Sequence, residues 1–221
     1  AGMDVIRINS AHLDIDGALK IIRNARSVSE RIGILIDTKG PEIRTTACDT
    51  PVELLKGEKV MMAGNPGEKS THGHINVSYS NFVTDVPEGS EILIDDGDIA
   101  LRAMKRDGNL LECLVEDGGM LGSRKSVNIP GVKICLPSLT EKDRRFISMA
   151  VENDVDFIAH SFVRTKQDVI DVQAILDDHK SPVKIIAKIE NEEGFKNIDE
   201  ILEHVYGIMV ARGDLGIEIP Y

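Results

Sequence analysis

The sequence predicts an α/β fold, a partial TIM-type (β/α)8 barrel interrupted by an inserted all-β domain. Helix-like and strand-like segments alternate over residues 1–44 and again over residues 134–221, as in a parallel sheet with crossover helices. Between residues 45 and 133 the pattern changes to short strands and turns. We therefore predict a first barrel part at 1–44, an inserted β-barrel-like domain at 45–133 and a second, truncated barrel part at 134–221.

The elements of the first barrel part follow from hydrophobic periodicity. A helix is expected near residues 15–31, and Gly33 ends it. Strands are expected on either side of this helix, at 5–9 (VIRIN) and 34–38 (ILIDT). The apolar face of the helix is formed by Leu19, Ile22, Ala25 and Val28.

In the second barrel part, two helices begin with a capping residue that is followed three positions later by an acid. The pairs are Thr140 with Asp143 and Thr165 with Asp168, and we interpret all four residues as helix caps. The expected helices are 140–153, 166–179 and 197–205, and the expected strands are 156–162, 184–190 and 206–211.

The inserted domain contains strands predicted at 74–79, 91–96, 98–104 and 110–116. Asp96-Gly97 and Asp107-Gly108 stand where tight hairpins would turn.

Composition excludes several classes of protein. The net charge of −11, from 26 basic and 37 acidic residues, should repel nucleic acid and anionic membranes. No apolar run approaches the roughly 20 residues needed to span a bilayer, and the N-terminus has no signal-peptide pattern. Cys48, Cys113 and Cys135 are too widely spaced for a zinc motif, as expected of reduced thiols in a cytoplasmic protein.

Lys188 and Glu190 are two positions apart in the apolar run KIIAKIE, which predicts a buried strand. Side chains two apart on a strand point to the same face. Burying charged groups is costly unless they are paired or bind an ion. The alternatives are a functional site and a buried ion pair of structural value only.

Polar residues end five of the predicted strands, and the carboxyl ends of barrel strands form active sites. Glu190 and Asp214 are candidate ligands of Mg²⁺ or Mn²⁺, which prefer oxygen donors. Arg7, Lys188 and Arg212 would offset phosphoryl charge. Backbone amides near Ala211 and Gly213 could bind a carboxylate, although this segment is equally typical of a turn. The strand-end residues are Arg7 and Asn9; Asp37, Thr38 and Lys39; His160 and Ser161; Lys188 and Glu190; Arg212 and Asp214.

Several long motifs in this order resemble the pyruvate kinase family over essentially the whole chain. They are RINSAH at 7–12, DTKGPEIR at 37–44, IDDGDI at 94–99, VNIPG at 127–131, LPSLTEKD at 136–143, SFVR at 161–164, KIIAKIEN at 184–191 and MVARGDLGIEI at 209–219.

The resemblance implies phosphoryl transfer from phosphoenolpyruvate to ADP, giving pyruvate and ATP in glycolysis. It implies that Lys188 stabilises the transferred phosphoryl group and the enolate, and that Arg7 binds phosphate. Glu190 and Asp214 would bind the divalent ion, and Ser161 would contact the substrate. The segment Ala211–Gly213 would hold the substrate carboxylate.

The resemblance also implies that the inserted domain closes as a lid. Arg44, Lys125 and Asp96 are similar to residues that the family places near the nucleotide. The alternative for these three is a hairpin turn or a solvated surface charge.

A potassium site is implied as well, with one departure from the family pattern. Asn9, Asp37 and Thr38 match the K⁺ ligands, and Glu42 matches the acid of K⁺-dependent members. Ala11 stands where the family commonly has a serine, so the site is one oxygen short unless Ser10 or water supplies it.

The family's chain is longer at both ends, and a closed barrel needs eight strands where five are predicted here. We therefore expect a segment that is inactive by itself, from an enzyme that forms a homo-oligomer, a tetramer in the family. Two other functions remain open: a Mg²⁺-dependent barrel lyase or aldolase acting on an oxoacid enolate, and an inactive ligand-binding fragment.

Overall fold

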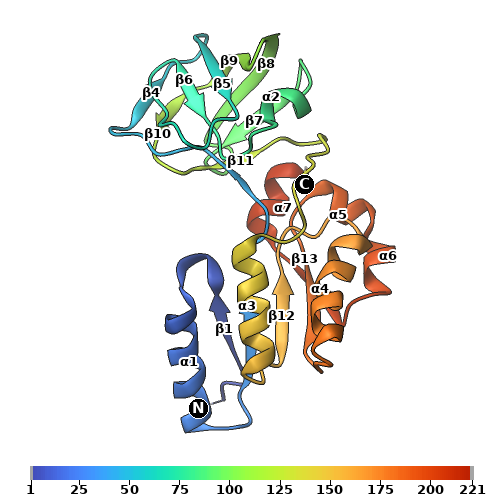
Figure 1. Ribbon diagram of the computed structural model, residues 1–221. Helices are drawn as coiled ribbons and strands as arrows, with labels where there is room; N and C mark the ends of the chain where they lie inside the picture. Colours follow the sequence, from blue (N-terminus) through green and yellow to red (C-terminus); the bar gives the residue numbers. More distant parts are fainter. Residues whose placement is uncertain (1, 220–221) are drawn as a thin grey trace. The chain divides into compact units, whose positions relative to one another are not determined.

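The computed structural model describes residues 2–219, and the chain divides into two compact units (Figure 1). The barrel unit comprises the chain up to Pro41 together with Leu136–Leu215. The β unit comprises Glu42–Cys135 together with the described residues from Gly216 onward.

The barrel unit is built on one parallel sheet whose strands end at a common edge. The register pairs Asn9 with Asp37, Asp37 with Ala159, and His160 with Ala187. The carboxyl ends of neighbouring strands therefore lie together, as the sequence predicted. The strand order is β1 (Val5–Asn9), β2 (Gly33–Asp37), β12 (Phe157–His160), β13 (Lys184–Ile189) and β14 (Gly207–Val210), and every neighbouring pair is parallel.

Helices follow the strands along the chain. The predicted capping box of α3 is confirmed, because Thr140 and Asp143 exchange hydrogen bonds at its first turn. No helix within residues 2–219 is long and apolar enough to cross a membrane. The helices are η1 (Ser10–His12), α1 (Ile15–Val28), α3 (Glu141–Glu152), α4 (Lys166–Asp178), α5 (Glu192–Lys196), α6 (Ile198–Leu202) and α7 (Arg212–Glu218).

Five details of the helix prediction differ from the structure. The first helix ends at Val28, and α6 is shorter than 197–205 and follows a separate helix, α5, that the sequence did not indicate. α7 was not predicted. Val28 is 78% exposed, because at 100° per residue it lies about 120° around the helix from Ile22.

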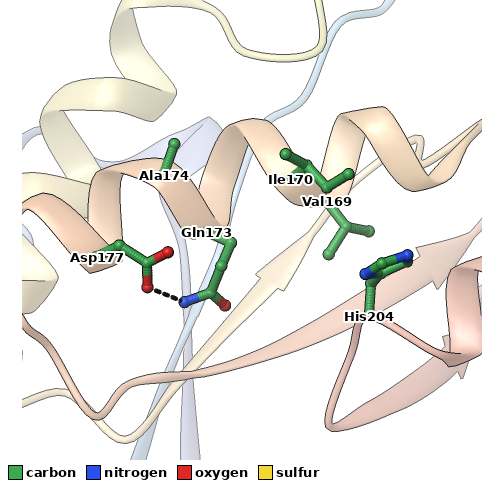
Figure 2. Close-up of a pocket in the computed structure, with 6 residues that line it drawn as sticks. All are labelled: Val169, Ile170, Gln173, Ala174, Asp177 and His204. Atoms are coloured by element: carbon green, nitrogen blue, oxygen red, sulfur yellow. Dashed lines mark hydrogen bonds between the residues drawn. The ribbon is translucent and has the colours of Figure 1, made fainter.

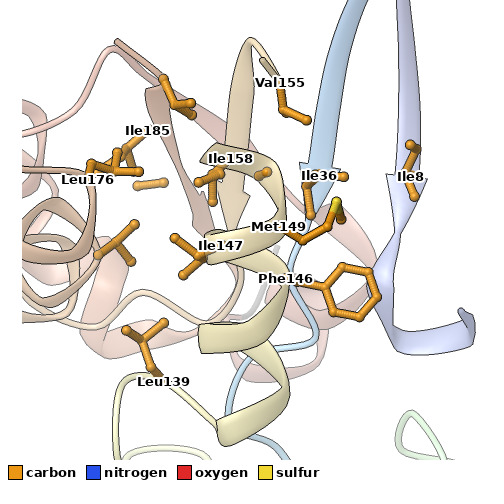
Figure 3. Close-up of a cluster of buried hydrophobic side chains, with 14 of the residues drawn as sticks. Ile8, Ile36, Leu139, Phe146, Ile147, Met149, Val155, Ile158, Leu176 and Ile185 are labelled. Atoms are coloured by element: carbon orange, nitrogen blue, oxygen red, sulfur yellow. The ribbon is translucent and has the colours of Figure 1, made fainter. Parts of the chain in front are cut away.

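The core of the barrel unit lies between the sheet and its helices. Figure 3 shows Phe146 and Met149 of α3 pointing toward Ile36 and Ile8 of the strands, and all four side chains are buried. Ile34, Ile158 and Ile185 are further buried strand residues of this cluster, and Val169, Val172 and Leu176 of α4 pack into it.

The described part of the β unit between Glu42 and Cys135 contains two sheets and the short helix α2 (Phe82–Asp85). The strand bounds are β3 (Ile43–Arg44), β4 (Val52–Leu54), β5 (Lys59–Ala63), β6 (His74–Asn76), β7 (Glu91–Ile94), β8 (Ile99–Asp107), β9 (Leu110–Asp117), β10 (Gly119–Leu121) and β11 (Ser126–Asn128). The larger sheet has the order β3-β11-β7-β8-β9-β5-β6, and β10 pairs with β4 in the smaller one.

Both predicted hairpins occur. β7 and β8 join through a turn in which Asp95, Asp96 and Gly97 all have positive φ, and β8 and β9 join at Gly108.

Replacing a buried apolar residue should lower the stability of the barrel unit far more than replacing an exposed one. Phe146→Ala removes a fully buried ring and should lower the unfolding free energy of the barrel unit by about 3–5 kcal/mol. Val28→Ala, at an exposed position, should change it by less than about 0.5 kcal/mol. Urea unfolding followed by circular dichroism measures both, and equal effects would contradict the assigned core.

Candidate active site

Lys188 lies near the carboxyl end of β13 in the barrel sheet, with its side chain 9% exposed. Its Nζ is 3.0 Å from Asp37 Oδ1 and 3.0 Å from Glu190 Oε1. It also donates to Ser161 Oγ at 2.7 Å. One ammonium group therefore joins residues from the ends of β2, β12 and β13.

Asp37 links Lys188 to Arg7. The Arg7 Nε donates to Asp37 Oδ2 at 2.6 Å, while Asp37 Oδ1 faces Lys188 and lies 3.2 Å from Ser161 Oγ. The Asp37 side chain is 2% exposed, whereas that of Arg7 is 56% exposed. The outer part of the Arg7 guanidinium can therefore meet an anion arriving from solvent.

Glu190 is a buried carboxylate under competing influences. Burial raises its pKa, and the charge of Lys188 and the hydrogen bond from the Phe162 N–H oppose that rise. The negative charge of Asp214 raises the pKa further. A cation shared by Glu190 and Asp214 would remove this repulsion.

The segment Ser161–Phe162 bridges the neighbouring strands. The Phe162 N–H donates to Glu190 Oε2 at 2.7 Å, and Phe162 has a φ of 56°, in the left-handed region that a bulky residue rarely adopts. Ser161 Oγ accepts from Lys188 and lies 2.7 Å from the Thr38 carbonyl oxygen, to which it can donate. The backbone of this segment thus contacts Glu190, and its serine side chain contacts Lys188.

The loop after β2 packs directly on that segment. The Ser161 N–H donates to Thr38 Oγ1 at 3.0 Å. Gly40 has a φ of 69°, and a Cβ there would lie 2.8 Å from Ser161 Cβ. Glycine is required at this position by conformation and by space.

His160 lies beneath the same edge and is fully buried. Its Nδ1 is 3.3 Å from Thr38 Oγ1, and its Nε2 has no hydrogen-bond partner among the described residues. Burial lowers the pKa of the imidazole to about 4, against the raising effect of Asp143 and Asp168. His160 is therefore neutral at pH 7.

The predicted metal ligands are oxygen donors whose chemistry suits the ions proposed for them. Within residues 2–219 no group of three or more His, Cys, Asp or Glu side chains could hold a metal ion. Asn9 Oδ1 accepts the Ala11 N–H at 2.9 Å and keeps a second lone pair. Ser10 Oγ is buried without a partner among the described residues.

The predicted carboxylate-binding segment lies at the start of α7. The Ala211 N–H donates to the Ile189 carbonyl oxygen at 3.2 Å, and α7 begins at Arg212. Arg212 and Gly213 are exposed and Asp214 is half-buried. This segment was not predicted to be helical.

The three predicted nucleotide-side residues belong to the β unit. Arg44 pairs with Glu42 at 2.7 Å, and Lys125 pairs with Asp95 at 2.7 Å. Asp96 accepts from Ser126 Oγ at 2.8 Å.

A separate pocket lies between α4 and the segment that joins α6 to β14 (Figure 2). None of its lining residues is a predicted site residue. His204 lies three residues before the amino end of β14, whereas the site residues lie at the carboxyl ends of the strands. The lining residues are Val169, Ile170, Gln173, Ala174, Asp177 and His204.

Comparison with known proteins agrees with the motifs. A family model described as "Pyruvate kinase, barrel domain" matches residues 1–221. A pyruvate kinase of Borreliella burgdorferi is 47% identical over 221 residues, covering 100% of this chain and 46% of the relative. One of Geobacillus stearothermophilus is 45% identical over 228 residues, covering 100% of this chain and 39% of the relative. The chain thus spans less than half the length of these curated relatives. The family match confirms the predicted fold class, a partial α/β barrel.

Stability should depend on pH through His160. Because its folded pKa, about 4, lies below 6.5, the ordinary pKa of a histidine side chain, the unfolded chain binds a proton between pH 4 and pH 6.5 that the folded chain does not. The stabilisation is present above pH 6.5 and is lost as the pH falls toward 4, by up to about 3 kcal/mol. His160→Gln keeps a polar group near Thr38 without titrating, and should flatten urea midpoints measured against pH in that window. Identical slopes in both proteins would contradict the assignment.

Proposed function

This chain belongs to the pyruvate kinase family, and on that premise we propose that it contributes part of the active site of an enzyme that transfers a phosphoryl group from phosphoenolpyruvate to ADP, giving pyruvate and ATP. The single observation that supports this best is the buried Lys188 between Asp37, Glu190 and Ser161 at the carboxyl edge of the sheet. The enzyme would act in glycolysis in the cytoplasm, as a homotetramer like its family.

Lys188 and Arg7 would supply the positive charge that the acidic chain otherwise lacks. Lys188 is held by three partners without being fully enclosed, so its ammonium can turn toward negative charge that develops on the phosphoryl group and the enolate. Preorganised charge of this kind stabilises a transition state because it needs no rearrangement during the reaction. Arg7, whose guanidinium extends to solvent, would bind the incoming phosphate.

Glu190 and Asp214 would hold Mg²⁺ or Mn²⁺, which neutralises charge on the substrate when bound. The backbone of Ala211–Gly213 and the Arg212 side chain would orient the substrate carboxylate, and Ser161 would contact the substrate beside Lys188.

Potassium would bind near Asn9, Asp37 and Thr38.

On the nucleotide side, Arg44, Lys125 and Asp96 of the β unit would contact ADP, with that unit acting as a lid.

Replacing Lys188 should lower turnover more than it weakens substrate binding, because its charge is assigned to the transition state. In the protein produced from the complete gene, Lys188→Met should reduce kcat for pyruvate formation by about 10²–10³-fold. Lys184→Met, at the exposed start of the same strand, is the matched control and should leave kcat unchanged. A kcat for Lys188→Met close to that of the wild-type protein would remove the assignment. A wild-type protein that binds phosphoenolpyruvate but produces no pyruvate would show a binding function instead.

The potassium site should respond to an oxygen at position 11. Ala11→Ser should lower the K⁺ concentration for half-maximal pyruvate formation, because a hydroxyl adds a hard ligand. The cysteine of Ala11→Cys has almost the same shape as the serine, but its soft sulfur binds K⁺ poorly. Ala11→Cys should therefore not lower the K⁺ concentration for half-maximal pyruvate formation. Equal responses of the two variants, or activity indifferent to K⁺, would contradict the proposed site.

A further inference from the structure

Asp143 divides its two carboxylate oxygens between a helix and a loop. Its side chain is 0% exposed. Oδ2 caps α3 by accepting from the Thr140 N–H at 3.0 Å and the Thr140 hydroxyl at 2.6 Å. Oδ1 accepts the backbone N–H groups of Lys39 at 3.0 Å and Gly40 at 3.3 Å, which belong to the loop after β2. The cap alone needs only Oδ2.

The loop that Oδ1 holds is in close contact with the segment after β12. A Cβ on Gly40 would meet Ser161 Cβ at 2.8 Å, the Ser161 carbonyl oxygen at 2.9 Å and Phe162 Cδ2 at 3.0 Å. Thr38 adds two hydrogen bonds to Ser161, through Oγ1 and the carbonyl oxygen. The two segments therefore cannot shift independently.

Phe162 needs this support. Its left-handed φ of 56° costs free energy for a bulky residue and persists only where the surroundings fix it. That conformation points the Phe162 N–H at Glu190 Oε2, 2.7 Å away. Glu190 in turn contacts Lys188 through its other oxygen, Oε1.

We propose that Asp143 is a positioning residue, which orients the Glu190 carboxylate for its divalent ion through the Lys39–Gly40 loop and the Phe162 N–H. The proposal rests on the proposed function, since the ion-binding role of Glu190 is part of it. Asp143 itself contacts neither Glu190 nor Lys188 in any hydrogen bond or ion pair of the described structure.

Removing Asp143 should move the loop because a buried hydrogen-bond donor without an acceptor is costly in free energy. Without Oδ1, the N–H groups of Lys39 and Gly40 would each lose their partner, and such groups turn toward water when the chain allows it. The loop would then leave Ser161–Phe162, and Phe162 would relax to negative φ. Groups that orient metal ligands in this way typically change metal affinity by about 10–100-fold when they are removed.

The variants separate the loop contact from the helix cap. Asp143→Ala removes both. Thr140→Ala weakens the same cap on the same helix and leaves Oδ1 in place. Asp143→Asn can direct its carbonyl oxygen at the two loop N–H groups and its amide at the Thr140 hydroxyl, so it should keep the loop and lose part of the cap.

Two measurements on the protein produced from the complete gene give the test. Hydrogen exchange of the peptide containing Phe162 reports on its N–H without reference to any activity. Titration with Mn²⁺, followed by electron paramagnetic resonance of the free ion, reports on the ion site, and Glu190→Gln provides the reference for its loss.

Asp143→Ala should speed exchange at Phe162 and weaken Mn²⁺ binding by about 10-fold or more. Thr140→Ala and Asp143→Asn should bind Mn²⁺ within about 2-fold of wild type, with midpoints of thermal unfolding lowered by about 2–4 °C. Equal losses of Mn²⁺ affinity in Asp143→Ala and Thr140→Ala would overturn the proposal, because loss of the helix cap alone would then account for the weaker binding. Faster exchange with unchanged Mn²⁺ affinity would also overturn it.

Two other outcomes of this experiment must also be distinguished. If the wild-type protein binds no Mn²⁺, the metal site of the proposed function is wrong, and the positioning role falls with it even if exchange shows that Asp143 holds the loop. If Asp143→Ala does not fold, Gly40→Ala disturbs the same contact with Asp143 intact. It should weaken Mn²⁺ binding, and unchanged affinity in Gly40→Ala would overturn the proposal.

Discussion

The rest of the barrel unit depends on the burial of Lys188. An ammonium taken out of water is stable only if opposite charge and hydrogen-bond acceptors surround it, and here Asp37, Glu190 and Ser161 all lie within 3.0 Å of its Nζ. These partners come from three parallel strands. The register of the sheet, which brings the strand ends to one edge, is therefore a condition for the charge to be buried at all.

Helix capping and site geometry use the same groups. A cap needs one acceptor for the first turn, yet Asp143 also accepts from the loop after β2. At α4, Asp168 accepts the N–H groups of Arg164 and Thr165, in the loop that leads from β12 into that helix. Each helix start is thus tied to the loop that leads out of a strand of the site. Loops fixed in this way hold side chains more exactly in place than free loops would.

Periodicity and strand chemistry predicted the five strands and the shared face of Lys188 and Glu190, because both follow from local pattern. The α5 and α7 helices were missed, since they are short and contain glycine. The left-handed Phe162 has no sequence signal, because its conformation depends on contact with Gly40, which is distant in the chain. The available hint was Gly40 itself, a glycine two residues after the end of a predicted strand. Asp143 was identified only as a cap, since its second set of partners is a tertiary contact.

The charges of the site constrain what can bind there together. Lys188 and Arg7 balance Asp37 and Glu190, and Asp214 adds a negative charge that acts on Glu190. A phosphorylated substrate arriving alone would bring more negative charge to two carboxylates that already repel each other. A divalent cation arriving alone would leave an excess of positive charge beside Lys188 and Arg7. In the proposed function the two are therefore expected to favour each other's binding, because each offsets the charge that the other introduces.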